Sequence, residues 1–163
     1  KSSAASDVYK RQVCRITDIC QKEFSGVIKD YYILTPLSNE TMTIFVPVNN
    51  KLLTNRIKRI LSKGEICDLI TTASSKPINW IIDDNERKEH YRTILSSSNR
   101  LEILNMIREL YIHKQEQLKN GKKMHLSDEQ LMKEAERLLY SEFSLVLNIR
   151  ADEVPKFISS RIN

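Results

Sequence analysis

The segment Thr41-Met42-Thr43-Ile44-Phe45-Val46-Pro47-Val48 decides the fold class, because the pattern of the chain changes directly after it. Its β-branched and aromatic residues favour an extended strand. After Asn50 the apolar residues recur at helical spacing, as in Arg56-Ile57-Lys58-Arg59-Ile60-Leu61, which is typical of an amphipathic helix. The sequence therefore predicts an α+β protein in which a β module precedes a helical one.

Two more extended segments precede this strand, at residues 13–20 and 31–35, and both alternate roughly with a period of two. Turn-like residues separate the three segments, with Phe24-Ser25-Gly26 in the first connection and Leu37-Ser38-Asn39-Glu40 in the second. A sheet of two or three short strands is marginally stable unless it curls into a barrel or packs on another element. The residues therefore predict a β module over residues 12–53 that either curls into a small barrel or packs on another element.

The second module, residues 54–163, is predicted to be a compact all-α bundle of four to five helices. Asn99 is a good N-cap for a helix whose apolar stripe includes Leu104 and Ile107. Ser127-Asp128-Glu129-Gln130 has the pattern of a capping box at the start of the next helix. The expected helices lie at about 56–70, 80–95, 99–120, 127–147 and 152–162.

The composition indicates a soluble, helix-rich chain, because 29% of its 163 residues are charged and only 3 are glycine. No apolar stretch approaches the roughly 20 residues that cross a bilayer. The net charge of +5 is spread over both modules, so any phosphate contact must come from a local patch. Residues 1–11 have no apolar period, and we interpret them as an unstructured tail or a cloning remnant.

Signals of enzymatic or metal chemistry are nearly absent from the sequence. The 3 glycines cannot form a phosphate-binding loop, and the three histidines lack the spacing of metal ligands. Cys14, Cys20 and Cys67 are an odd number of cysteines without paired spacing, as expected for ordinary cytosolic thiols. We therefore expect no cofactor and no catalytic residue, although an enzyme that uses surface carboxylates stays open as an alternative.

The single tryptophan, Trp80, is the most informative side chain of the helical module. It follows a proline-containing loop, and three cations lie downstream of it: Arg87, Lys88 and Arg92. A lone tryptophan usually packs into the core. The alternative is that Ile81 and Ile82 fill the core while the ring wedges against unstacked bases and the cations hold the DNA backbone.

The chain resembles the CarD family of bacterial transcription regulators in the order and spacing of five short segments. They are Lys29-Asp30-Tyr31-Tyr32-Ile33-Leu34, Thr43-Ile44-Phe45-Val46-Pro47, Pro77-Ile78-Asn79-Trp80, Leu126-Ser127-Asp128-Glu129 and Ala135-Glu136-Arg137-Leu138-Leu139. The resemblance runs from about residue 13 to residue 162. It implies a Tudor-like, SH3-like β-barrel followed by a helical DNA-binding domain.

The resemblance also implies partners for each module. The barrel would pair a strand with the RNA polymerase β subunit, here through Thr43, Ile44, Phe45 and Val46. The helical domain would contact promoter DNA in the minor groove at the upstream edge of the melted bubble, with Trp80 as the wedge and Arg87, Lys88 and Arg92 nearby.

Two departures from the family pattern qualify these expectations. The family opens with a strand that is replaced here by a Ser/Ala-rich start, which leaves open whether the barrel has its first strand. Asp83 and Asp84 stand where many members have basic residues after the tryptophan, so we expect the helical domain alone to bind DNA weakly.

From residues and resemblance together, we expect a cytoplasmic, monomeric, non-enzymatic transcription regulator with no membrane contact. It would bind polymerase through the β module and stabilise the promoter open complex through the helical domain. The alternative is a protein–protein adaptor with no direct DNA contact, in which Trp80 is buried.

Overall fold

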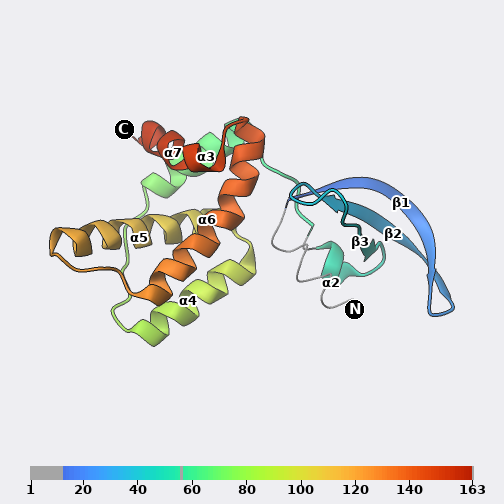
Figure 1. Ribbon diagram of the computed structural model, residues 1–163, viewed down its shortest axis with the longest axis horizontal. Helices are drawn as coiled ribbons and strands as arrows, with labels where there is room; N and C mark the ends of the chain where they lie inside the picture. The colour runs from blue at the N-terminus through green and yellow to red at the C-terminus, as the bar shows by residue number, and fades with distance from the viewer. Residues whose placement is uncertain (1–12, 56, 163) are drawn as a thin grey trace. The chain divides into compact units, whose positions relative to one another are not determined.

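The computed structural model describes residues 13–55 and 57–162, which belong to two compact units that divide between Ile60 and Leu61 (Figure 1). The sequence placed this boundary after residue 53. The division falls later because helix α2 (Lys51–Thr54) and Ile57 belong with the sheet: Leu53 and Ile57 pack against its core. The predicted tail, residues 1–11, lies outside the described residues.

The N-terminal unit is built on an antiparallel sheet of three described strands in the order β1-β2-β3. The strands are β1 (Cys14–Phe24), β2 (Val27–Pro36) and β3 (Ile44–Pro47). Ser25 and Gly26 connect β1 to β2 with φ of 54° and 77°, the backbone that a tight two-residue hairpin turn requires. The predicted β module is confirmed, although these strands form an open sheet and not a closed barrel.

The two faces of this sheet carry different side chains. Leu34, Ile44 and Val46 are buried and form a small core together with α2. On β3, Phe45 alternates with these buried residues and contacts Phe24 and Tyr31 edge-to-face, with ring centroids 5.7 Å and 6.3 Å apart. Period-two alternation thus places one face on the core and gives the other an aromatic cluster.

The C-terminal unit contains five α-helices and one short 3-10 helix among its described residues, within the predicted range. They are α3 (Lys63–Ser74), α4 (Asp84–Ser97), α5 (Arg100–Lys119), α6 (Leu126–Leu147), η1 (Ala151–Glu153) and α7 (Val154–Ile162). Asn99 caps α5 as predicted, accepting hydrogen bonds from the backbone N–H groups of Leu101 and Glu102.

The predicted starts of helices α3 and α6 are wrong. Helix α3 begins at Lys63, because Ser62 and Glu65 form a reciprocal capping box there. Helix α6 begins at Leu126, so the expected box at residues 127–130 lies inside the first turn. Asp128 is instead buried, at 1% exposure, and accepts a hydrogen bond from Arg87 of α4. Its side chain therefore takes no part in a cap.

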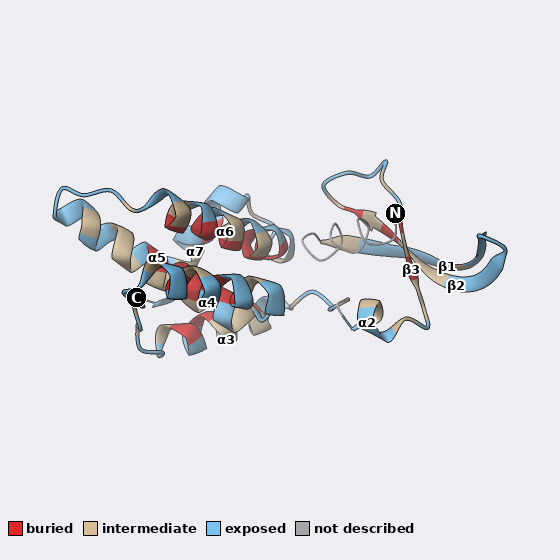
Figure 2. Ribbon diagram, turned by 90° about the horizontal axis from the view of Figure 1, so that it is seen from below, coloured by how far each residue is buried: buried red, intermediate tan, exposed pale blue. Residues whose placement is uncertain are grey.

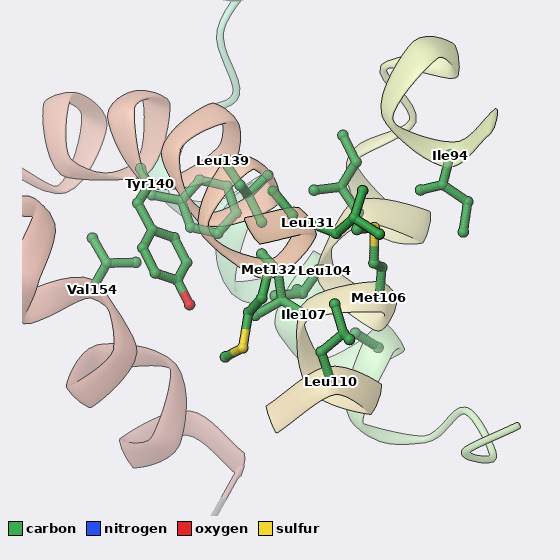
Figure 3. Packing of buried hydrophobic residues seen from close by; sticks show 14 of the residues in the cluster. Ile94, Leu104, Met106, Ile107, Leu110, Leu131, Met132, Leu139, Tyr140 and Val154 are labelled. Atoms are coloured by element: carbon green, nitrogen blue, oxygen red, sulfur yellow. The ribbon is translucent and has the colours of Figure 1, made fainter. Parts of the chain in front are cut away.

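One hydrophobic core holds the helical unit together. Figure 2 shows buried residues on the sides of α4, α5 and α6 that face one another. Leu104, Ile107 and Leu110 of α5 pack with Leu131 and Leu139 of α6, as the close-up in Figure 3 shows. Across residues 13–55 and 57–162, we find no helix with the length and apolar character needed to span a membrane.

Candidate protein and nucleic-acid interfaces

Trp80 lies in the segment between α3 and α4, and its ring is partly buried. The indole stacks on the His113 imidazole, with centroids 3.6 Å apart and planes inclined by 12°. The Arg87 guanidinium carbon lies 4.5 Å from the ring centroid, a cation–π distance. The ring also packs against the helical core, so the core interpretation holds for part of this side chain, and the wedge role of the exposed part stays a prediction.

The expected position of Trp80 in the first turn of a helix is wrong. Helix α4 begins at Asp84, with Asp83 as its N-cap. The expectation that Ile82 fills the core is also wrong, because Ile82 is 87% exposed. The ring therefore contributes to the core, while the isoleucine two residues later is presented to solvent.

Arg87 holds this segment in place. The side chain is 2% exposed, and all five guanidinium N–H donors have acceptors. Nε and Nη2 bond to the two carboxylate oxygens of Asp128 at 3.1 Å and 2.7 Å, and Nη2 also bonds to Asp84 at 2.7 Å. Nη1 donates to the carbonyl groups of Ile81 and Ile82 at 2.9 Å and 3.3 Å.

These contacts change the role expected for Arg87. We predicted a phosphate contact, but the guanidinium has no N–H left for a phosphate in this arrangement. Lys88 is partly buried and Arg92 is exposed, so these two predicted cations stay accessible. The hydrogen bond from Arg87 lowers the pKa of Asp84, which favours its carboxylate form. Burial lowers the pKa of His113, which favours the neutral form of the imidazole that stacks on the ring.

Several residues at this site could not be identified from the sequence. His113, Asp128 and Glu109 come from helices α5 and α6, far from Trp80 along the chain; Glu109 accepts hydrogen bonds from the Asn79 N–H and the Tyr91 hydroxyl. Exposed Lys122 and Lys123 lie within three residues of His125, whose Nδ1 is 3.4 Å from Asp84. The connection between α5 and α6 thus carries two exposed cations and contacts the first turn of α4 through His125.

The second candidate interface is the outer edge of β3. Within the described residues, β3 pairs with β2 alone. The Val48 N–H donates to the Asp30 carbonyl at 3.0 Å, and in an antiparallel ladder N–H directions alternate along the strand. Ile44 and Val46 therefore direct their backbone groups toward β2, and Phe45 directs its N–H and C=O toward the open edge.

The residues predicted for polymerase binding differ in exposure. Ile44 and Val46 are buried, Phe45 is partly buried, and Thr43 is exposed and precedes the strand. The side chains of the two buried residues are occupied by the core of the sheet. What this strand offers a partner is therefore its backbone, together with Phe45 and Thr43.

The amino-acid sequence matches two family models that together cover most of the chain. The CarD-like/TRCF RID domain matches residues 8–61, and the CarD C-terminal domain matches residues 65–159. The chain belongs to the CarD family. No curated protein matches it.

The CarD matches coincide with the two structural units. The first contains the open edge of β3, and the second contains Trp80, Arg87 and His113. The first match starts at residue 8, inside the segment that we interpreted as a tail. The chain is thus a CarD-like transcription regulator that interacts with RNA polymerase, and CarD proteins are non-enzymatic transcription factors. In the part of the chain that the structure describes, no group of three His, Cys, Asp or Glu side chains could hold a metal ion.

Proposed function

We propose that this CarD protein binds the β subunit of RNA polymerase through the outer edge of β3 and stabilises the promoter open complex through its helical unit. The proposal places the protein in the cytoplasm, where polymerase and promoter DNA are found together. The observation that carries it is the outward-directed backbone of Phe45 on an edge of β3 that pairs with no other described strand, within a unit that belongs to an RNA polymerase-interacting family.

Strand addition suits the chemistry of this edge. A partner strand obtains affinity from main-chain hydrogen bonds and specificity from alternate side chains. Phe45 offers one N–H and one C=O to such a partner, and its ring lies in the cluster with Phe24 and Tyr31. The proline at residue 47 ends the strand and lacks an N–H group, which limits how far a partner strand can extend.

The helical unit would meet DNA at the Trp80 segment. The partly exposed indole and the exposed side chain of Ile82 are apolar groups of the kind that wedge between base steps in the minor groove. Lys88, Lys122 and Lys123 would contact the phosphates, while Asp83 lies close to the wedge and keeps the intrinsic affinity low. Attachment to polymerase raises the local concentration of the helical unit, so weak DNA binding suffices.

A pull-down with polymerase tests the first half of the proposal. Phe45→Pro removes the outward N–H without removing a hydrogen bond to β2, and Phe45→Asp places a charge at the same edge. Phe45→Leu keeps the backbone donor and is the matched control. We expect the control to retain polymerase and the other two to lose it, with unchanged far-UV circular dichroism. Retention of polymerase by both variants would refute strand addition.

Open-complex lifetime on a promoter tests the second half. Trp80→Ala and Ile82→Ser should both shorten the lifetime, by about tenfold or more for the tryptophan if a base-stacking contact is lost. Ile82→Ser should leave the thermal midpoint unchanged, because the side chain has no core contact to lose. A variant pair that retains polymerase and the full lifetime would favour the adaptor without direct DNA contact.

A further inference from the structure

The packing of α3, α5, α6 and α7 leaves an open cleft of about 520 Å³ in the helical unit, a size typical of small-molecule sites. The walls are mainly aliphatic and come from all four helices. They include Ile70, Leu104, Ile107, Met132, Ile158 and Ile162. Figure 3 shows Ile107 and Met132 close to Tyr140 and Val154 on one side of the core. Met132 gives this wall a flexible side chain that adapts to the shape of an apolar ligand.

The polar groups of the cleft favour an anion. Three cations line it, Arg108, Lys114 and Lys156, against a single carboxyl group, Glu136. Burial raises the pKa of Glu136, which favours its neutral form and reduces repulsion of an anion beside it. The charge of the lining is thus complementary to a negatively charged ligand group.

Arg108 is held in a fixed orientation at this cleft. Its Nη1 donates to the carbonyl of Ala73 at 2.9 Å and to the carbonyl of Lys76 at 2.6 Å. Its Nε and Nη2 make no hydrogen bond with any residue in the described ranges. A guanidinium that is anchored through one nitrogen keeps donors for a bidentate carboxylate.

Tyr140 supplies a second polar group. The residue is 8% exposed and lines the cleft, and its hydroxyl has no hydrogen-bond partner among the described residues. Figure 3 shows this hydroxyl pointing to the same side as the end of the Met132 side chain. Burial raises the pKa of Tyr140 above its usual range, so the hydroxyl stays protonated and can donate.

We propose that this cleft is a binding site for an aliphatic carboxylate, with the hydrocarbon chain against the apolar walls and the carboxylate on Arg108. The site lies in the helical unit and does not depend on polymerase or DNA binding. The aliphatic lining selects the chain, and the excess of cations together with the free donors of Arg108 selects the anionic head. A neutral or cationic amphiphile of the same length would leave these donors unused.

The proposal is tested on the full chain by titrating its backbone amide NMR signals with decanoate, decanol and decylammonium. We expect saturable shifts for decanoate at residues of the cleft, such as Ile107, Tyr140 and Ile158. Decanol should bind about tenfold more weakly, the loss expected for one charge-assisted contact, and decylammonium should bind more weakly still. Equal affinity for all three, or shifts that do not saturate, would overturn the proposal.

Two variants locate the site. Arg108→Gln should reduce decanoate affinity to that of decanol and leave decanol unchanged, whereas Arg92→Gln, a cation outside the cleft, should change neither. Ser159→Trp places an indole in the cleft from α7 and leaves Arg108 of α5 unchanged. It should weaken the binding of both decanoate and decanol, and it tests the site if the arginine variant unfolds. Decanoate affinity that survives Ser159→Trp, or self-association of the chain that buries the cleft in sedimentation experiments without ligand, would refute the site.

Discussion

Replacing Arg87 by methionine should unfold the helical unit far more easily than its position on a charged helix suggests. The change keeps most of the side-chain volume but removes both hydrogen bonds to Asp128, whose side chain is 1% exposed. Breaking a buried ion pair by removing one partner costs about 3–5 kcal/mol, because the remaining charge is uncompensated. The carbonyl groups of Ile81 and Ile82 lose their donor in the same variant. We therefore expect a loss at the upper end of this range.

Urea unfolding, measured by Trp80 fluorescence, reports the free energy of unfolding of the helical unit alone, because Trp80 is the only tryptophan of the chain. For a domain of this size, even a loss of about 3 kcal/mol, the lower end of the range, corresponds to a drop in thermal midpoint of about 15 °C. Lys88→Met is the matched control, and its free energy of unfolding should stay within about 0.5 kcal/mol of the parent.

The double variant Arg87→Met/Asp128→Leu separates the lost ion pair from lost packing. It should recover much of the stability, because it removes the unpaired carboxylate as well. About 1 kcal/mol is the typical cost of an ordinary substitution. If Arg87→Met lowers the free energy of unfolding by less than this, Arg87 does not organise the Trp80 segment, and its expected role as a phosphate contact is open again.

Further predictions concern the two cores and the pH dependence of stability. Ile44→Glu should unfold the N-terminal sheet, since Ile44 is 2% exposed. The far-UV circular dichroism of the sheet and the binding of polymerase should then be lost together. An Ile44→Glu variant that stays folded would contradict the packing of β3. Amide hydrogen exchange should be slowest within residues 99–147, where α5 and α6 supply most of the large core, and slower exchange in 13–48 would count against that ranking. Burial raises the pKa of Glu136 above its ordinary value of 4.5, so the folded chain binds a proton that the unfolded chain releases, and the free energy of unfolding should fall as pH rises from 4.5 through the raised pKa. Glu136→Gln should abolish this fall and raise the thermal midpoint at neutral pH, and an unchanged pH profile would refute the assignment.

The sequence predicted the elements better than the contacts between them. Strand alternation and helical spacing are local signals, so the three strands, the cap at Asn99 and the long apolar stripe of α5 could be identified from the residues themselves. The role of Arg87 could not be predicted in this way, because its main partner, Asp128, lies 41 residues further along the chain. The sequence showed only a cation on a charged helix, which is usually solvated.

The Trp80 segment shows the same limit. Its apolar residues have no helical or strand-like spacing, so nothing in the sequence distinguishes a buried isoleucine from the exposed Ile82. His113 stacks on the ring only because α5 passes beside it. Likewise, the alternation of β3 predicted a strand, but the direction of the Phe45 backbone groups depends on the register with β2.

The segment that carries Trp80 is attached to the helices at three places along its length. Arg108 holds the Lys76 carbonyl, Glu109 holds the Asn79 N–H, and Arg87 holds the carbonyls of Ile81 and Ile82. Fixing the backbone of one residue costs roughly 1–2 kcal/mol of conformational entropy, and here that cost falls on folding of the helical unit. A partner that meets Trp80 and Ile82 therefore encounters a pre-organised surface, and little further ordering opposes the association.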